Sequence, residues 1–235
     1  MKIFIRVSSL AKSVLDGLLI NKTFRYYYVR IRFYYFYKFL KKIEVHPDFQ
    51  NSINLKYNMN FEPFAFGCLQ RMSLLLNPAL GLLYPHPETS DVLIVAPRTE
   101  DDIIWARALG MKKAIGLDIF SYSPLIKVGD AHQVDEISDS SFDMILIGWL
   151  LPYIDDPAKV VREMLRICKK NGVIGFAWSH VSDDVLLNDS VRNNRINELS
   201  EILDLFEEEK NNIVSLIDCS YRGSAHRAIF IRKKG

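Results

Sequence analysis

The sequence has no disulfide framework and no long apolar run. Its three cysteines, Cys68, Cys168 and Cys219, lie far apart, so they form neither a disulfide pattern nor a metal-ligand spacing. No apolar stretch reaches the roughly 18 residues that a membrane-spanning helix needs. Lys12 and Asp16 interrupt the apolar N-terminus too early for a signal peptide. These absences predict a cytoplasmic protein with no metal centre.

The sequence also has little excess charge. The 30 lysines and arginines nearly balance the 28 acidic residues, which leaves a formal net charge of +2. Proteins that hold nucleic acid by its phosphates are usually strongly basic, so nucleic acid is not an expected partner. The chain of 235 residues, 49% hydrophobic and 25% charged, has the size and composition of one folded core with an appendage.

No glycine-rich loop follows the first regular buried strand. That strand, 92–96, runs into Ala96-Pro97-Arg98-Thr99, and the acids Glu100, Asp101 and Asp102 come next. A dinucleotide places its pyrophosphate here, where it needs close-approaching glycines and free N–H groups. Three acids in the first turn of a helix would repel phosphate. The turn therefore disfavours a nicotinamide dehydrogenase and favours a ligand without phosphate.

From residue 91 onward, short apolar runs alternate with helical patterns. Only residues 120–124 separate the second run from the third, too few for a crossover helix. The alternation predicts a Rossmann-like, mostly parallel seven-stranded sheet with helices on both faces. The expected strands are 92–96, 114–119, 125–128, 142–148, 173–178, 213–217 and 226–231, the last two forming a hairpin, and the expected helices are 99–109, 155–170 and 195–209.

Residues 1–90 have a different character and are expected to form a helical and irregular extension to the domain of residues 91–235. Residues 24–42 are rich in aromatic and basic side chains, and the pattern only weakly favours a helix. Three interpretations remain open. The segment could pack as a cap on the domain, contact a membrane surface with its cations at lipid phosphates, or stack on single-stranded nucleic acid. Peripheral membrane contact is therefore one expectation for this segment.

Ligands of open α/β sheets bind at the carboxyl ends of the strands. Asp118 ends the second strand, where a carboxylate can accept both hydroxyls of a ribose. Asp130 follows the third strand, where it can accept an adenine amino group while the N–H of Ala131 donates to the ring. Phe120 or Trp149 could cover the adenine face. The alternative for both acids is that their side chains cap turns.

S-adenosylmethionine fits these groups, because it carries a sulfonium and an ammonium but no phosphate. Ala96 and Glu100 would lie beside it, and Arg98 is the candidate donor to its carboxylate. His132 is the one candidate general base, although a plain loop histidine is the alternative. His226, like the other histidines at 46 and 86, belongs to no cluster in the sequence and is expected to be structural.

Taken with this order of strands, several motifs resemble the class I S-adenosylmethionine-dependent methyltransferases over about residues 91–178. By position, Asp118 matches the family's ribose-binding acid and Asp130 its adenine-side acid. Two departures are the replacement of the usual Gly-x-Gly by Ala96-Pro97-Arg98 and the missing helix between strands two and three. Pro97-Arg-Thr-Glu with that missing helix resembles a bacterial subgroup linked to surface-glycan synthesis. The motifs are Gly129–His132, Ser141–Asp143, Asp155–Pro157 with Glu163 and Arg166, and Lys170–Gly172.

The resemblance implies methyl transfer from S-adenosylmethionine to a small molecule or glycan precursor. An alternative is a catalytically inactive binding protein of the same fold, which acts through a partner or a membrane surface. Ala96-Pro97, where glycines are usual, is the feature that keeps this alternative open.

Overall fold

The computed structural model describes residues 9–50, 72–97, 99–179, 196, 198–221 and 224–235. Its centre is a seven-stranded sheet with strand order β5-β3-β2-β6-β7-β9-β8, of which the first five strands are mutually parallel. The antiparallel hairpin β8–β9 extends it beyond β7. The predicted mostly parallel sheet is confirmed. The strands are β2 (Val92–Val95), β3 (Ile115–Asp118), β5 (Ile126–Val128), β6 (Phe142–Gly148), β7 (Cys168–Ser179), β8 (Ile213–Tyr221) and β9 (Ser224–Arg232).

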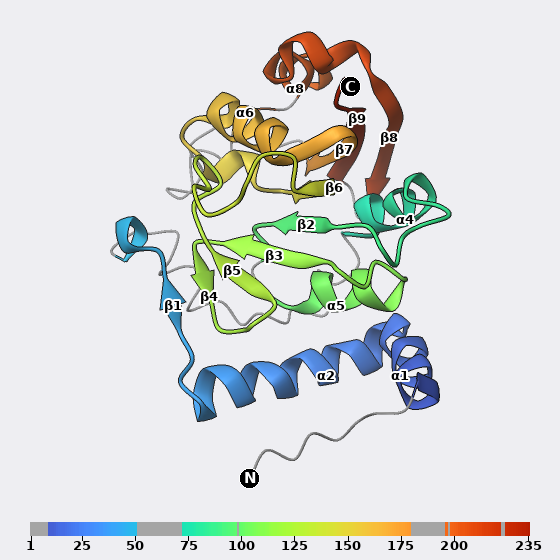
Figure 1. The fold of residues 1–235 in the computed structure, drawn as a ribbon, viewed down its shortest axis with the longest axis vertical. Coiled ribbons are helices and arrows are strands. Elements are labelled where there is room, and N and C mark those ends of the chain that lie inside the picture. Colours follow the sequence, from blue (N-terminus) through green and yellow to red (C-terminus); the bar gives the residue numbers. More distant parts are fainter. Residues whose placement is uncertain (1–8, 51–71, 98, 180–195, 197, 222–223) are drawn as a thin grey trace.

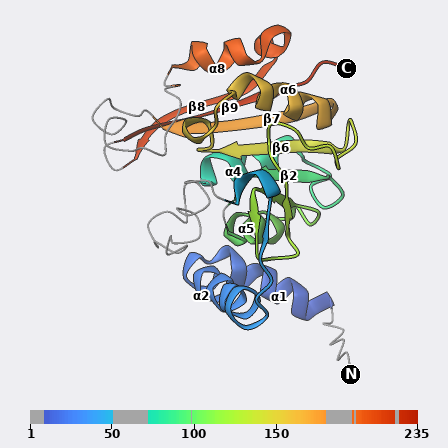
Figure 2. The ribbon, with the colours of Figure 1, turned by 90° about the vertical axis from the view of Figure 1, so that its left-hand side faces the viewer.

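Helices cover both faces of the sheet because its central strands are buried on both sides (Figures 1 and 2). On one face, α6 (Pro157–Ile167) and α8 (Leu199–Leu205) pack over one apolar core. On the other face, α4 (Ser73–Leu82) and α5 (Asp101–Ala108) pack over a second. Helix α6 starts where the sequence predicts. The Asp156 side chain accepts a hydrogen bond from the Lys159 N–H at 2.8 Å, and Pro157 is the first residue of the helix.

No crossover helix connects β3 to β5, as expected. A two-residue strand, β4 (Phe120–Ser121), lies there instead and pairs with β1 (Glu44–Val45) of the N-terminal part. Aromatic rings from the N-terminal part cover this connection. The ring centroid of Phe33 lies 4.9 Å from that of Tyr122, and Tyr37 lies 6.3 Å from Phe120. The extension therefore supplies apolar cover where the domain lacks its own helix.

The N-terminal part forms a helical layer at the end of the molecule opposite α8 (Figures 1 and 2). It contains α1 (Ser9–Ile20), α2 (Lys22–Phe33) and a π-helical continuation, Tyr34–Phe39. The Asn21 side chain begins α2 by accepting hydrogen bonds from the N–H groups of Thr23 and Phe24. The weakly favoured helix in residues 24–42 is thus present, and the segment is helical rather than irregular. Within the described residues, no helix combines the length and apolar character needed to cross a membrane.

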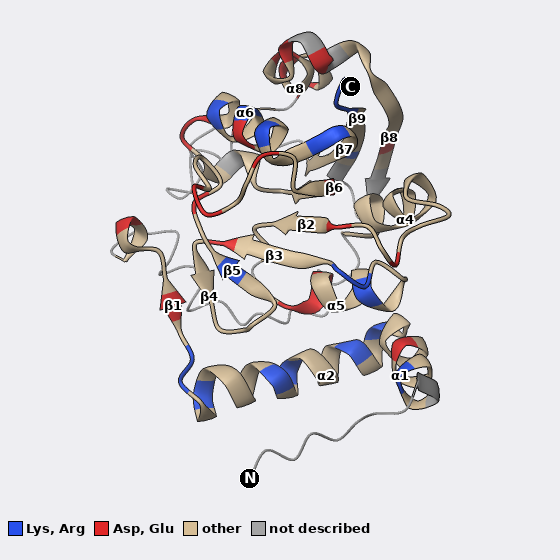
Figure 3. Ribbon diagram, in the orientation of Figure 1, with Lys and Arg blue, Asp and Glu red and all other residues tan. Residues whose placement is uncertain are grey.

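Two arginines of α2 point inward and pair with acids at the start of α5. The Arg25 Nε atom lies 3.0 Å from Oδ1 of Asp101, and both side chains are almost fully buried. Arg32 makes two hydrogen bonds of 2.7 Å to the Glu100 carboxylate. Basic positions on α2 therefore face acidic positions on α5 (Figure 3). Because these two arginines bind Asp101 and Glu100, they do not make the contacts with lipid phosphates that the sequence pattern suggested for this segment.

Candidate functional site

The carboxyl ends of the parallel strands meet at one edge of the sheet, as the shared strand direction requires. The antiparallel strand β9 begins at the same edge, because His226 is the register partner of Ser179. The residues collected there are Ala96 after β2, Asp118 at the end of β3, Asp130–His132 after β5, Trp149 after β6, Ser179 at the end of β7 and His226 in β9.

The turn after β2 has a left-handed residue although it has no glycine. Ala96 has a φ of 53°, and its N–H donates to the Leu117 carbonyl at 2.7 Å. Pro97 is buried beside Gly116, where an added Cβ would lie only 2.8 Å from the proline ring. The backbone therefore adopts at Ala96 a conformation that favours glycine. Arg98, the expected donor to a ligand carboxylate, lies outside the described residues.

Changing Ala96 to Gly should leave the fold unchanged and slightly raise its stability. Holding a non-glycine residue in the left-handed region costs about 1–2 kcal/mol, and the added freedom of glycine in the unfolded chain offsets part of this gain. We expect the free energy of unfolding, measured by urea denaturation, to rise by about 0.5 kcal/mol. A loss of more than about 1 kcal/mol would show that the Ala96 methyl group matters more than the strain.

Two acids at the start of α5, Glu100 and Asp101, bind arginines of α2. The Glu100 side chain is fully buried, bound by Arg32 and by a short hydrogen bond from the Ser123 hydroxyl. Burial raises the pKa of the Asp101 carboxyl, and the guanidinium of Arg25 opposes that rise. Glu100 therefore belongs to the interface with α2, and the expectation that it contacts a cofactor is not supported by its position.

This arrangement changes the reason for disfavouring a pyrophosphate at this turn. Arginines compensate the Glu100 and Asp101 carboxylates, so acidic repulsion is not the obstacle. The obstacle is that N–H groups of the turn already have partners. The N–H of Glu100 donates to the Tyr122 hydroxyl at 3.0 Å, and that of Asp101 donates to the Thr99 hydroxyl at 3.3 Å. Because these two N–H groups already donate to side-chain hydroxyls, the helix start has fewer donors left for a phosphate.

Phe120 is also placed differently from the sequence prediction. It is 5% exposed and packs with Tyr37 and Tyr122 beneath the N-terminal helices. Its backbone pairs with Val45 of β1. A ring held in this core does not cover an adenine, because the N-terminal part already occupies its surroundings. Trp149 remains as the aromatic candidate at the strand ends.

The two acids expected to bind a nucleoside end neighbouring parallel strands. Asp118 is 7% exposed, and it is the register partner of Val128 in β5. Asp130 follows two residues later, and its Oδ1 accepts a hydrogen bond from the His132 N–H at 3.0 Å. Asp130 therefore caps a turn with one oxygen, while Oδ2 has no hydrogen bond within the described part of the chain. The Ala131 N–H is likewise unbonded among those residues.

His132 is held on both sides of its ring. Its Nδ1 lies 2.7 Å from Oδ1 of Asp130, and its Nε2 lies 3.5 Å from the N–H of Asp156 at the start of α6. With Nδ1 assigned as the proton donor to the carboxylate, Nε2 carries a lone pair. The N–H of Asp156 donates only a long, weak hydrogen bond to that lone pair. The geometry thus accommodates either a loop histidine or a base.

Helix α6 fixes the loop that follows His132. The Glu163 carboxylate accepts the Val134 N–H at 2.7 Å and also binds the Arg166 guanidinium. Arg166 in turn donates to the carbonyls of Val134 and Ile137. The Arg166 hydrogen bonds lower the pKa of Glu163, and the Val134 N–H contributes to the same effect. The Glu163 carboxylate therefore holds the loop that directly follows the Asp130–His132 segment.

The Glu163 contact should make the fold sensitive to acid. Because the folded-state pKa lies below the unfolded one, this stabilisation is present above the unfolded pKa and is lost as the pH falls through the folded pKa. We expect Glu163→Gln to cost about 1–2 kcal/mol at pH 7 and to flatten the stability profile in the acid range. Urea denaturation at several pH values would measure both effects. A parallel displacement of the two profiles would contradict the role of Glu163 ionisation.

A polar cluster that the sequence pattern did not predict lies at the same edge, beside the ends of β6 and β7. The Trp149 Nε1 donates to the Ser179 hydroxyl at 2.6 Å, and that hydroxyl lies 2.5 Å from Nδ1 of His226. His226 is 8% exposed, and its ring centroid lies 6.1 Å from that of Trp149. Trp149 has a φ of 57°, a left-handed conformation. The only sequence signal was that Ser179 and His226 begin or end strands of the same sheet.

Comparison with known proteins identifies the same fold. Residues 104–176 match the family described as Methyltransferase domain. No curated protein has a matching sequence. Two of the solved structures with a similar fold are described as methyltransferases. A Haemonchus contortus phosphoethanolamine N-methyltransferase, solved with S-adenosylhomocysteine, has a TM-score of 0.59 and 11% identity, covering 80% of this chain and 60% of that one. A Thermotoga maritima SAM-dependent methyltransferase has a TM-score of 0.51 and 18% identity, covering 76% and 97%.

The fold is not restricted to methyl transfer. The cyclase SpnF also resembles this chain, with a TM-score of 0.50 and 13% identity over 62% of this chain and 74% of that one. These identities show the fold alone. The match of residues 104–176 to the methyltransferase domain indicates S-adenosylmethionine as the cofactor. The chain therefore has the fold of the class I S-adenosylmethionine-dependent methyltransferases, and its residues 104–176 match their methyltransferase domain.

Proposed function

We propose that this protein transfers a methyl group from S-adenosylmethionine to a small molecule or a glycan precursor. The observation that carries the proposal is the pair Asp118 and Asp130 at the ends of the adjacent strands β3 and β5. Oδ2 of Asp130 and the N–H of Ala131 have no hydrogen bonds within the described residues. One acceptor and one donor are thus offered side by side, which suits the edge of an adenine ring.

The proposed site assigns one task to each of these groups. Asp118 would accept the ribose hydroxyls, while Asp130 and Ala131 would recognise the adenine edge. Ala96 would lie beside the methionine part of the cofactor, and Trp149 would lie toward the acceptor. When bound, the cofactor supplies an electrophilic methyl group on a sulfonium. The protein then contributes chiefly by holding the acceptor in line with that methyl group.

A hydroxyl acceptor would require a base, and His132 is the proposed one. Its Nδ1 is bound to Asp130, so the lone pair on Nε2 can receive the acceptor proton as the new bond forms. A small-molecule acceptor is supported by the Haemonchus contortus neighbour, whose structure holds phosphomonomethylethanolamine. The glycan precursor is supported by the resemblance of the Pro97–Glu100 turn to enzymes of surface-glycan synthesis.

Transfer of a labelled methyl group would test this function. We would incubate the full chain with methyl-labelled S-adenosylmethionine and a panel of small amines and sugar-phosphate or glycan hydroxyl acceptors. We expect labelled product in at least one class, and a loss of at least tenfold in rate with a hydroxyl acceptor when His132 is changed to Ala. The matched control is His86→Ala, because His86 lies outside the strand-end edge.

A second candidate is a non-catalytic protein of the same fold. The left-handed Ala96 and the buried Pro97 favour it, since a glycine is usual in such a turn. Binding of S-adenosylhomocysteine without transfer to any acceptor in the panel would support this second function over the first.

A further inference from the structure

An apolar stripe runs along the outer face of the N-terminal helices. Most of the exposed large apolar side chains of the described residues lie in this part of the chain. Ile20 ends α1, and from Phe24 onward spacings of mostly three and four residues place the others on one side of α2 and its π-helical continuation, with exposures from 38% at Phe24 to 77% at Phe39. We call this surface the outer stripe; it consists of Ile20, Phe24, Tyr27, Ile31, Tyr34, Tyr35 and Phe39.

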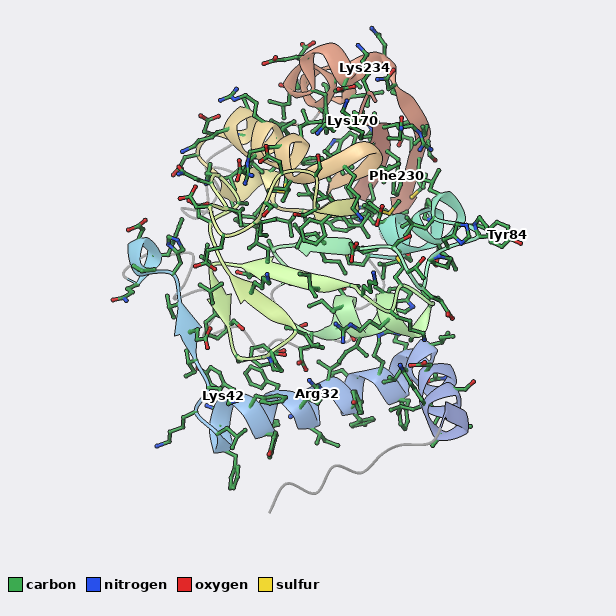
Figure 4. All side chains as sticks on the ribbon, viewed as in Figure 1. Arg32, Lys42, Tyr84, Lys170, Phe230 and Lys234 are labelled. Carbon is green, nitrogen blue, oxygen red and sulfur yellow. The ribbon has the colours of Figure 1, made fainter. Side chains whose placement is uncertain are left out.

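The orientation of α2 reverses the usual arrangement of a surface helix, which turns its apolar face inward and its charges outward. Arg25 and Arg32 face inward and bind acids of α5, as described above, and Figure 4 shows Arg32 on the side of α2 that faces the domain. Ile31, between them in the helix, is 69% exposed. Buried ion pairs thus hold α2 in a position that leaves its apolar side without cover from the described residues.

The charge around the outer stripe is mainly positive, and the first acid after the stripe is Glu44, which is exposed in β1. Residues 22–43 contain no aspartate or glutamate. Lys38, Lys41 and Lys42 are exposed at the end of the helical segment, and Lys12 is exposed on α1. The acid of α1, Asp16, is paired with Lys112 at 2.6 Å. The outer stripe therefore combines exposed apolar side chains with an excess of cations, and its charge is complementary to an anionic surface.

We propose that the outer stripe docks the protein on an anionic lipid bilayer. The helical segment lies in the plane of the interface, with Ile31 and Phe39 entering the acyl boundary. The tyrosine hydroxyls remain at headgroup depth, and the lysines meet lipid phosphates. This proposal goes beyond the proposed methyl transfer and does not depend on it. A second copy of the chain is the competing occupant, but the excess of cations disfavours pairing two such surfaces.

Vesicle sedimentation with the full chain tests the proposal. The vesicles would contain either phosphatidylcholine alone or phosphatidylcholine with about one third phosphatidylglycerol, a composition that supplies surface charge. We expect binding to the anionic vesicles, weaker binding to the neutral ones, and a marked decrease at high salt. The variant Ile31→Glu/Phe39→Glu should bind the anionic vesicles at least about tenfold more weakly, because two apolar side chains no longer enter the interface.

The matched control is Tyr84→Glu, which adds a charge at an apolar side chain that is 80% exposed and lies away from α2 (Figure 4). This variant should bind the vesicles as the wild type does. Circular dichroism and thermal denaturation would confirm that both variants are folded, since all three side chains are exposed. Equal vesicle binding by the wild type and the double variant would overturn the proposal. The proposal would also be overturned if the wild type were a dimer that does not bind vesicles and the double variant were a monomer.

Discussion

Replacing Arg25 by Met is expected to lower the free energy of unfolding by about 3–5 kcal/mol, since removing one partner of a buried ion pair leaves the other charge uncompensated. The Arg25 side chain is only 1% exposed, and its Nε atom lies 3.0 Å from Oδ1 of Asp101. The central carbon of its guanidinium lies 4.3 Å from the Trp105 ring centroid. It also donates to the carbonyls of Leu19 and Ile20 at the end of α1. One side chain therefore joins α1, α2 and α5, and urea denaturation would measure the loss.

Two further variants separate the charge from the packing. Arg30→Met removes a partly exposed arginine of the same helix and should cost less than about 1 kcal/mol. The double variant Arg25→Met/Asp101→Asn should recover much of the loss, because the buried carboxylate no longer carries a charge. Among the described residues, the buried Oδ2 of Asp101 already has no hydrogen-bond partner. Equal effects of Arg25→Met and Arg30→Met would contradict the role of the buried pair.

Changing Asp118 to Ala is expected to weaken binding of S-adenosylhomocysteine by about 100-fold. A carboxylate that accepts two ribose hydroxyls makes two charge-assisted hydrogen bonds, each contributing about 1.5–3 kcal/mol. Isothermal titration calorimetry of the purified variants would measure the change in Kd. Asp118→Asn keeps the shape of the side chain and one acceptor oxygen, so it should fall between Ala and the wild type.

A matched acid in the nearby loop provides the control. Asp135 is exposed, and its side chain accepts hydrogen bonds from Gln133. Asp135→Ala should leave the affinity unchanged within about twofold, because surface substitutions away from a site have small effects. Unchanged affinity in Asp118→Ala, with a folded protein by circular dichroism, would exclude Asp118 from the site.

The succession of strands along the chain and the missing helix could be predicted from the sequence because both depend on local patterns. Short apolar runs with helical patterns between them predict the alternation of strands and helices, and the five residues 120–124 between the second and third predicted strands leave no room for a crossover helix. The acids at the strand ends were located for the same reason. Sheets of parallel strands bring their carboxyl ends together wherever the strands are found.

The partners of the acidic turn could not be predicted, because they come from far away in the sequence. Arg25 is 76 residues from Asp101, and Arg32 is 68 residues from Glu100. The aromatic and basic composition of residues 24–42 indicated a special surface, but it did not reveal which face turns outward. Burying Arg25 requires a compensating acid, and only the folded arrangement of α2 against α5 identifies that acid.

The Trp149–Ser179–His226 cluster was missed for a related reason. His226 reaches the strand-end edge through the antiparallel pairing of β9 with β7, which sets its register against Ser179. The sequence indicated a terminal hairpin but not which strand it would join. Phe120 was misplaced because the cover supplied by Tyr37 comes from the N-terminal part, whose position the sequence did not determine.

We expect the strand-end edge to bind S-adenosylmethionine despite the turn at Ala96-Pro97. Calorimetric titration of the full chain with S-adenosylhomocysteine, with NAD as the control, tests it most directly. We expect a Kd in the micromolar range, which corresponds to a binding free energy of about −8 kcal/mol, and no heat of binding with NAD. Absence of S-adenosylhomocysteine binding by a folded protein, or tighter binding of NAD, would contradict it.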